Sequence, residues 1–320
     1  MRIIDLHVDT ISRSVERGWD LAGGERTAHV DLPRLASSPV SCLGLSLWCD
    51  PPLPAPQRLW TLMEATERLV DANAERLRLV RTAEDLEHPA GTVALVPGVE
   101  GAHAFGGSLS VLERALDLGV RWVTLTWNNA NAWADSCFER GPTPGLTLAG
   151  REALAVLTER GCVADLAHAS QDAFWQTLEA RPKAVWVSHT ACAALAPHPR
   201  NLADDQIRGI ARAGGVCGII CCPEFLLPEN PDAAALDTLA DHLEHMVSVG
   251  GTECAAIGSD FDGVDRLPRG MQGVQDLARL IDRLRRRGWS EAQLQAVCWD
   301  NPRRVLGKVL PAPGTTGTNA

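Results

Sequence analysis

Short apolar runs alternate with amphipathic segments along most of this chain. Eight of the runs have the length and composition of buried strands, because they are apolar at nearly every position and end in Gly, Pro or polar residues. They cover residues 3–10, 40–48, 92–100, 120–126, 162–166, 184–187, 215–221 and 254–257. Helical patterns fall at about 57–80, 108–118, 147–160, 171–179, 204–213, 233–249, 272–287 and 290–299, and a long polar loop covers about 128–145.

Strands that are apolar on both faces and are followed by helices are typical of a parallel sheet covered on both sides. Eight such units predict an α/β protein with a (β/α)8 TIM-like barrel, as a single domain over residues 1–310. The alternative is an open doubly wound sheet, but no Gly-x-Gly-x-x-Gly follows the first strand. Residues 311–320 are rich in Pro, Gly and Thr, and we expect them to form a disordered tail.

Side chains that can bind metals stand where the predicted strands end. His7 and Asp9 lie two apart at the end of the first strand and should point the same way. Glu100 ends the third strand, His168 follows the fifth and His189 follows the sixth. Because the carboxyl ends of barrel strands meet on one face, we expect these five side chains to converge. Such a set suits two divalent ions, with Zn²⁺ preferred for its affinity for imidazole, and a carboxylate such as Glu100 can bridge them.

Each of these residues also has a simpler interpretation. A His and an Asp at a strand end can form an ordinary hydrogen-bonded pair, and a single His after a strand usually caps or packs. Asp260, after the eighth strand, adds another carboxylate to the site or caps a turn. His103, close to Glu100, either supports the site or is structural. The other histidines are expected in polar loops or on a helix face, at His29, His88, His198, His242 and His245.

Composition narrows the class of protein. A formal net charge of −10 argues against nucleic acid as a partner, because phosphate binding needs basic patches. No run of about 18 apolar residues and no signal peptide is visible, so we expect a cytoplasmic protein without a membrane partner. The ten cysteines form no Cys-x-x-Cys pair and are expected to be free thiols. The chain has ten Trp but no Tyr, so no role that needs a phenol can be filled.

Seven motifs, in this order, resemble those of the membrane (renal) dipeptidase family of the amidohydrolase superfamily, in a soluble bacterial-type form. The similarity covers about residues 3–305. The motifs are Asp-Leu-His-Val-Asp-Thr (5–10), Gly-Val-Glu-Gly-Ala-His (98–103), Leu-Thr-Trp-Asn-Asn-Ala-Asn-Ala-Trp-Ala-Asp-Ser (125–136), Asp-Leu-Ala-His-Ala-Ser (165–170), Val-Ser-His-Thr (187–190), Pro-Arg-Asn-Leu-Ala-Asp-Asp (199–205) and Gly-Ser-Asp-Phe-Asp-Gly (258–263).

The resemblance implies a barrel with a binuclear zinc centre that hydrolyses dipeptides, often with a D-residue at the C-terminal position. By this resemblance, His7 and Asp9 bind one zinc ion, His168 and His189 bind the other, and Glu100 bridges them. Two further residues match the family's functional positions. Arg200 would receive the carboxylate of the substrate, although an ion pair with Asp204 or Asp205 is an alternative, and Asp260 would transfer the proton.

Two positions depart from the family's pattern. Trp127 stands where mammalian dipeptidases have a His that contacts the scissile carbonyl, and it either lines the substrate pocket or packs at the strand end. Cys221 and Cys222 occupy the region where those enzymes have a Tyr. Both changes concern substrate contact rather than the metal ligands, so they bear on specificity.

The sequence therefore predicts a dipeptidase that takes small dipeptides and two divalent ions, and that could be a homodimer. A metallohydrolase of N-acyl amino acids, lactones, cyclic amides or phosphoesters is one alternative. A metal-binding homologue without catalytic activity is another, although retention of all five ligands and Asp260 argues against it.

Overall fold

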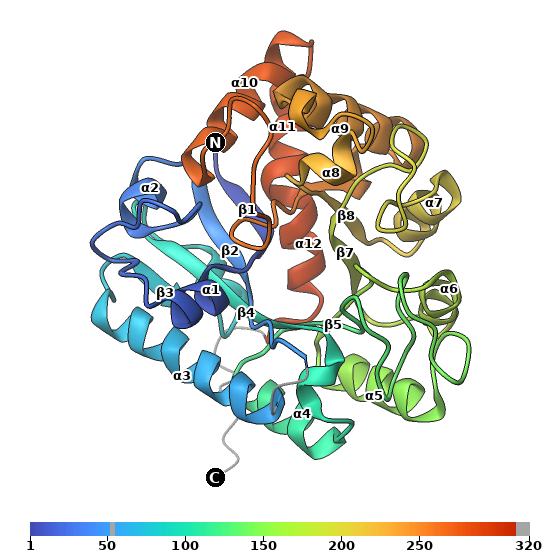
Figure 1. Cartoon of the computed structure of the whole chain (residues 1–320). Coiled ribbons are helices and arrows are strands. Elements are labelled where there is room, and N and C mark those ends of the chain that lie inside the picture. The colour runs from blue at the N-terminus through green and yellow to red at the C-terminus, as the bar shows by residue number, and fades with distance from the viewer. Residues whose placement is uncertain (52–54, 312–320) are drawn as a thin grey trace.

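Eight parallel strands close into a barrel in the computed structural model, which describes residues 1–51 and 55–311. The strands follow the order β2-β1-β9-β8-β7-β6-β5-β4, and β4 pairs with β2 to complete the ring (Figure 1). The strands are β1 (Ile3–Val8), β2 (Val40–Ser46), β3 (Leu77–Leu79), β4 (Val93–Glu100), β5 (Trp122–Thr124), β6 (Val163–Asp165), β7 (Val185–Thr190), β8 (Val216–Ile219) and β9 (Ala255–Ile257). This confirms the predicted barrel and excludes the open sheet.

The helices surround the barrel on its outer side, except for α12 (Asn301–Gly307), which lies across one end (Figure 1). They are α1 (Thr10–Arg17), α2 (Leu32–Ala36), α3 (Ala55–Ala72), α4 (Leu109–Asp117), α5 (Leu148–Glu159), α6 (Gln171–Glu179), α7 (Asp204–Arg212), α8 (Pro223–Leu226), α9 (Leu236–Gly250), α10 (Leu277–Arg286), α11 (Glu291–Gln295) and α12 (Asn301–Gly307). Several begin where the sequence places a capping residue. The Thr147 side chain accepts a hydrogen bond at the start of α5, and Ser170 does the same for α6.

The predicted helical stretch 57–80 is wrong in its last third. The helix α3 ends at Ala72, and the carbonyl of Asn73 then accepts hydrogen bonds from the amides of Arg76 and Leu77 in a turn. Leu77–Leu79 instead form a short strand, β3, which lies outside the eight-stranded ring and pairs with Val93–Leu95 of β4. This strand was not predicted. The three-residue strand β5 pairs only with Gly98–Glu100 of β4, so the first part of that edge of β4 is free to pair with β3.

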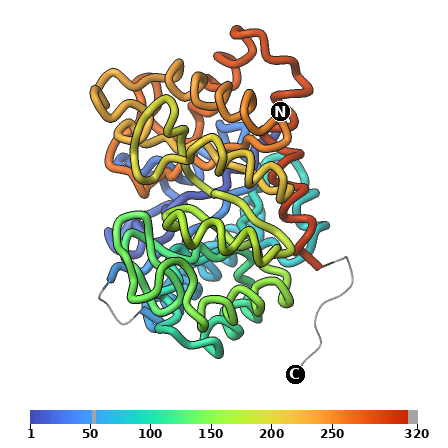
Figure 2. Tube along the Cα trace, turned by 90° about the vertical axis from the view of Figure 1, so that its right-hand side faces the viewer, coloured from blue at the N-terminus to red at the C-terminus, as the bar shows by residue number. Residues whose placement is uncertain are grey.

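The helical pattern also ends too early at the C-terminus. Beyond residue 299 the chain continues as α12, whose Pro302 lies in the first turn, where a missing amide hydrogen costs nothing. The helix lies across one end of the barrel, opposite the loop that follows β5 (Figure 2). Pro311 is the last described residue, and its carbonyl accepts a hydrogen bond from Ala83. The predicted tail otherwise lies outside the described residues.

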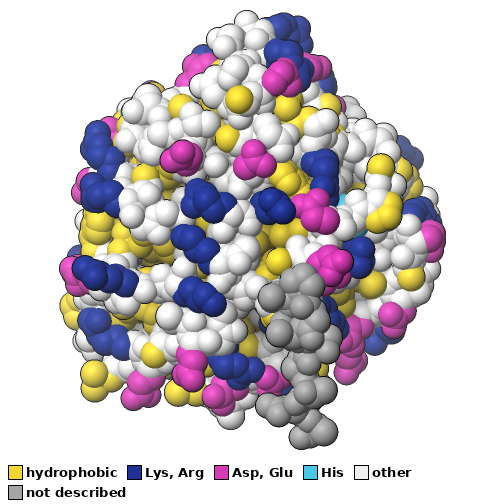
Figure 3. Space-filling model, turned by 180° about the vertical axis from the view of Figure 1, so that it is seen from behind, with side chains coloured by type: hydrophobic (Ala, Val, Ile, Leu, Met, Phe, Trp, Pro, Cys, Tyr) yellow, Lys and Arg dark blue, Asp and Glu magenta, His cyan; other side chains and the backbone are white. Residues whose placement is uncertain are grey.

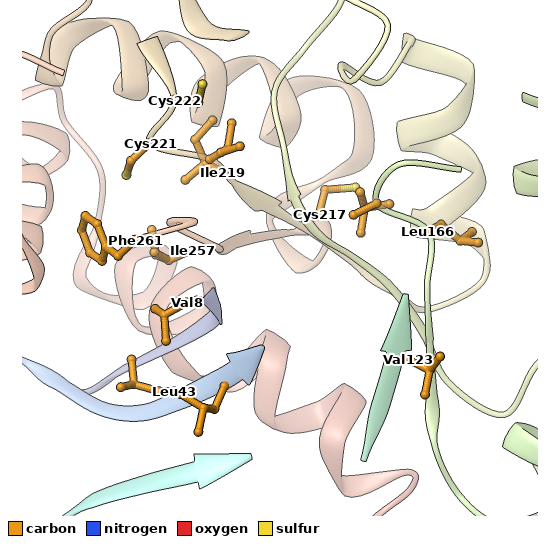
Figure 4. Packing of buried hydrophobic residues seen from close by; sticks show 14 of the residues in the cluster. Val8, Leu43, Val123, Leu166, Cys217, Ile219, Cys221, Cys222, Ile257 and Phe261 are labelled. Carbon is orange, nitrogen blue, oxygen red and sulfur yellow. The ribbon is translucent and has the colours of Figure 1, made fainter. Parts of the chain in front are cut away.

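Two apolar layers hold the barrel together. An inner cluster joins strand residues such as Ile4 and Ala256 to Trp122, Trp186 and the α12 residue Leu306. An outer, larger cluster lies between strands and helices, and Figure 4 shows part of it around Val123, Ile219 and Ile257. The inner cluster fills the barrel interior at the α12 end, whereas a cavity opens at the opposite end, where the strands end.

Charged side chains of both signs are intermingled on the face of the molecule seen from behind (Figure 3). All ten cysteines are free, as predicted. Among the described residues, no helix combines the length and the apolar character that crossing a bilayer requires.

The ring of Trp122 packs against Gly98 of β4 and leaves no room for a side chain at that position. A Cβ atom at Gly98 would lie 1.9 Å from the ring of Trp122, whose indole N–H donates to the carbonyl of Val96 at 3.0 Å. We expect Gly98→Ala to lower the free energy of unfolding by at least about 2 kcal/mol, measured by denaturant unfolding. The control is Gly307→Ala in α12, where a Cβ meets no atom within 4 Å. Equal stability of the two variants would contradict the packing described.

Candidate metal centre

The barrel brings the five predicted ligands together at the carboxyl ends of its strands. The Nε2 atom of His7 lies 3.3 Å from Oδ2 of Asp9 and 3.5 Å from Oε2 of Glu100. His168 and His189 approach from the neighbouring strand ends, with their Nε2 atoms 3.1 Å apart. All five side chains are buried. The alternative of a separate His7–Asp9 pair does not describe this arrangement, because the pair is in contact with a third ligand.

Glu100 divides its two carboxylate oxygens between two groups of residues. Oε2 faces His7, whereas Oε1 lies 3.0 Å from Nε2 of His168 and 3.5 Å from Nε2 of His189. The two oxygens of Glu100 therefore have different imidazole neighbours. A carboxylate that bridges two ions has this arrangement.

Several buried polar atoms fit bound cations better than they fit one another. Nε2 of His7 and Oδ1 of Asp9 have no hydrogen-bond partner within the protein. The groups His7–Glu100–His189 and His7–Asp9–Asp260 each offer three ligand atoms within 4.8 Å of one another. Imidazole nitrogens and carboxylate oxygens are ligands that zinc accepts. The residues present thus fit divalent metal ions.

The surroundings of the imidazoles set their charges. Burial opposes a charge on His7, but the carboxylates of Glu100 and Asp9 outweigh it and raise the pKa of His7 well above its usual value. Burial and the guanidinium of Arg200 lower the pKa of His168 to about 3. Burial and the charge of His7 lower the pKa of His189 well below its usual value. His168 and His189 are therefore neutral near pH 7, the form that binds metals, whereas ion binding at His7 has to displace a proton.

Asp260 lies beside this group of ligands, with Oδ1 3.9 Å from Nε2 of His7. Burial and the charge of Asp9 raise the pKa of Asp260 well above its usual value. Gly263 packs so closely that a Cβ there would lie 2.1 Å from Oδ1 of Asp260 and 2.3 Å from Oδ2 of Asp9. The nearby Asp262 has a structural role instead, because its carboxylate accepts hydrogen bonds from Thr10 and from the amide of His29, both at 2.6 Å.

Two of the site residues hold an unusual backbone conformation. His168 has φ of 65° and Asp260 has φ of 61°, in the left-handed region that costs non-glycine residues energy. Hydrogen bonds hold both in place. The amide of Asp260 donates to the carbonyl of His7 at 3.0 Å, and the carbonyl of His168 accepts from Cys137 at 2.8 Å. The fold therefore imposes the direction in which these two side chains point.

A cavity of about 640 Å³ opens above the ligands. Arg200 lines it and is only 4% exposed, with no ion pair to a carboxylate among the described residues. The alternative pairing of Arg200 with Asp204 or Asp205 is therefore wrong, since Asp204 pairs with His245 at 2.7 Å and lies near Arg208. Nε of Arg200 is buried and has no hydrogen-bond partner in the protein.

Aromatic residues form one wall of this cavity. The ring of Trp127 lies 5.2 Å from that of Trp48 and 6.4 Å from that of His168. Cys222 also lines the cavity, and its thiol donates to Glu224 at 3.3 Å. Trp127 therefore faces the cavity as well as packing against a neighbour.

The remaining histidines lie outside the group of ligands. His103 is structural, because its Nε2 atom contacts the carbonyl of Cys49 at 2.7 Å. His242 is buried and bonded to the backbone of Cys192 and Leu226. The others have local partners or neighbours: His29 with Asp262, His88 with the carbonyl of Ser41, His198 with the ring of Phe225 and His245 with Asp204.

The residues that contact the Nδ1 atoms of the three histidines were not predicted from the sequence. Nδ1 of His168 lies 2.8 Å from Oδ1 of Asn128, and Ser188 is in contact with His7 and His189. Trp48 was also missed. Ser188 and Asn128 stand next to predicted site residues in the sequence, but adjacency alone does not reveal their contacts.

Comparison with known proteins identifies the family. The family model described as membrane dipeptidase, peptidase family M19, matches residues 1–313. The dipeptidase aclJ of Aspergillus oryzae is 35% identical over 69% of this chain and 53% of its own length. Mouse dipeptidase 3 is 33% identical over 77% of this chain and 50% of its own length. The chain thus spans about half the length of these two curated relatives.

Solved structures agree in fold. The dipeptidase AC, a metallopeptidase of family M19, has a TM-score of 0.90 with 25% identity, covering 98% of this chain and 99% of that one. A metallopeptidase from Rhodobacter sphaeroides, solved with a phosphinate mimic of the dipeptide L-Ala-D-Ala, has a TM-score of 0.88 with 24% identity, covering 97% and 99%. This chain belongs to the membrane dipeptidase family, peptidase family M19.

Proposed function

We propose that this protein hydrolyses dipeptides, including those with an L-residue followed by a D-residue, with two divalent metal ions, preferably Zn²⁺. The observation that carries the proposal is the divided carboxylate of Glu100, which faces His7 with one oxygen and His168 and His189 with the other. Family membership supports the reaction. The Rhodobacter sphaeroides structure with a mimic of L-Ala-D-Ala motivates the proposed stereochemistry.

In this proposal, His7 and Asp9 would hold one ion, His168 and His189 would hold the other, and Glu100 would serve both. Two bound divalent cations would supply an activated water and polarise the scissile carbonyl. The protein's own part is to keep the imidazoles of His168 and His189 neutral, to hold the substrate and to move a proton.

Asp260 is the group that would move the proton. Its carboxylate lies at the edge of the metal ligands and also lines the cavity. A carboxylate at this place can accept a proton from the attacking water and deliver it to the amine nitrogen that leaves. The close packing of Gly263 and the left-handed backbone of Asp260 fix where its oxygens lie.

Arg200 would bind the C-terminal carboxylate of the substrate. A dipeptide has little surface, so its charged ends must carry much of the binding. The guanidinium is buried, and its Nε atom has no partner in the protein. A planar guanidinium can bind a carboxylate through two parallel hydrogen bonds, and burial strengthens the attraction.

Trp127 and Trp48 would bound the space for the substrate's side chains. An indole offers one N–H donor and no acceptor, so Trp127 cannot relay a proton as a His can. Its contribution is therefore to shape the pocket and to exclude water. This limits the consequence of the missing family His to specificity and rate.

A stereochemically complete dipeptide screen with the zinc-loaded protein tests the function. We expect hydrolysis of dipeptides, with L-Xaa-D-Xaa among them, and weaker or absent activity on N-acyl amino acids and phosphomonoesters. The control is Asp260→Asn, which should keep both zinc ions but lose about 10²- to 10⁴-fold in kcat. Wild-type protein that binds two zinc ions and hydrolyses none of these dipeptides would refute the proposal.

Arg200→Met should raise KM for dipeptides and lower kcat/KM by about 10- to 100-fold, since a hydrogen bond to a charged group contributes about 1.5–3 kcal/mol. A dipeptide amide lacks the carboxylate, so its hydrolysis should change much less. Steady-state kinetics on the two substrates measures the difference. Arg208→Met, on the exposed side of α7, is the matched control. An equal loss on both substrates would show that Arg200 does not bind the carboxylate.

Trp127→His should change substrate preference but not metal content. We expect the ratio of kcat/KM between dipeptides with large and small side chains to shift by about 10-fold, within the range that pocket contacts provide. Zinc analysis should still give two equivalents. Trp60→His on α3, where Trp60 packs against Arg114 away from the cavity, is the control. A collapse of zinc occupancy would show that Trp127 supports the metal centre and would contradict its assignment to the cavity wall alone.

A further inference from the structure

One hydroxyl group contacts ligands from both halves of the metal centre. Oγ of Ser188 lies 2.8 Å from Nδ1 of His189 and 3.4 Å from Nδ1 of His7. His7 belongs to the half with Asp9, and His189 to the half with His168. Ser188 is in β7, is fully buried and precedes His189 in the chain, whereas His7 is 181 residues away.

The single hydrogen of this hydroxyl is already used. It is donated to Oδ2 of Asp165 at 2.6 Å. Asp165 is itself fully buried at the end of β6 and receives two donors at each oxygen. Oδ2 also accepts from the hydroxyl of Thr124 at 2.8 Å, while Oδ1 accepts from the amides of Ser188 at 2.9 Å and Ala167 at 3.1 Å. A carboxylate with every position occupied by a donor can only accept.

It follows that Oγ of Ser188 can only accept hydrogen bonds from the two imidazoles. Both His7 and His189 must then carry hydrogen on Nδ1, which leaves Nε2 of each available on the side of Glu100. The third imidazole has its own partner, because Nδ1 of His168 contacts Oδ1 of Asn128 at 2.8 Å. The partner of one ring nitrogen decides which nitrogen binds a metal.

We propose that Ser188, anchored by Asp165, is a positioning residue that fixes the orientation and tautomer of one imidazole in each half of the centre. Loss of its hydroxyl weakens both ion sites together, whereas loss of the Asn128 amide weakens one. This rests on the two-metal function proposed above. The proposal rests on the three contacts of the buried Ser188 hydroxyl. It donates its single hydrogen to the carboxylate of Asp165 and accepts from the imidazoles of His7 and His189.

Zinc affinity, measured by competition with a chelator on the full chain, tests this without reference to activity. For Ser188→Ala we expect both zinc equivalents to bind about 10- to 100-fold more weakly. For Asn128→Leu only one equivalent should weaken by this factor. Cobalt substitution adds a second readout, because the visible spectrum of bound Co²⁺ should change at both sites in the serine variant and at one in the asparagine variant.

The matched control is Thr177→Val, which removes another fully buried hydroxyl that donates to the carbonyl of Ala173 at 2.7 Å in α6 and is remote from the centre. It should leave both zinc affinities unchanged. Ser188→Ala protein that binds both ions as tightly as wild type, or that weakens at one site alone, would overturn the inference. Wild-type protein with fewer than two zinc ions would instead overturn the proposed metal centre, and this inference with it.

Asp165→Asn covers the case in which Ser188→Ala does not fold. The asparagine amide can donate to Oγ of Ser188, which frees the hydroxyl hydrogen to turn toward an imidazole and favours the wrong tautomer. With Ser188 still present, we expect both zinc affinities to fall by at least about 10-fold, in protein whose folding is checked by circular dichroism. Folded Asp165→Asn protein with wild-type zinc affinity would also overturn the proposal.

Discussion

The buried carboxylate of Glu100 is the interaction on which the site depends. It is 3% exposed, and three imidazoles from three other strand ends surround it. A buried charge costs several kcal/mol unless it is compensated. His7 provides that compensation within the protein, because Glu100 and Asp9 raise its pKa. A pair of cations would provide it more completely and would also satisfy the unpartnered atoms of His7 and Asp9.

The barrel makes this cluster possible because one end is packed with apolar side chains and the other opens into a cavity. At one end, α12 and the inner tryptophans fill the interior, and Gly98 leaves room for the ring of Trp122. At the other end, several strands finish in polar side chains, such as Glu100 of β4, Asp165 of β6 and Thr190 of β7. Stability is therefore concentrated at the closed end, while the open end holds strained residues such as His168 and Asp260. Strain of this kind persists where the surrounding structure determines it, as the bonds to His7 and Cys137 do here.

The proposed metal ligands and the proposed substrate contacts lie in different parts of the open end. The five ligands and their outer partners lie at the strand ends, whereas Trp127, Trp48 and Cys222 belong to the cavity wall above them. A change in the wall can alter which substrate fits without altering the ligands. This separation lets a chain with no Tyr, and with Trp127 in the cavity wall, bring these five side chains together at its strand ends.

The sequence by itself determined the barrel and the five candidate ligands. Apolar runs of strand length encode buried parallel strands, and closing such strands forces their carboxyl ends onto one face, so His7, Glu100 and His168 had to meet. What it could not determine depends on contacts between distant segments. The sharing of one hydroxyl by His7 and His189, the burial of Arg200 and the extra pairing of β3 with β4 all arise from distances that local periodicity does not record. Asp260 and Asp262 belong to one motif but have different surroundings in the fold. Asp260 lies near His7, whereas Asp262 accepts hydrogen bonds from Thr10 and from the amide of His29.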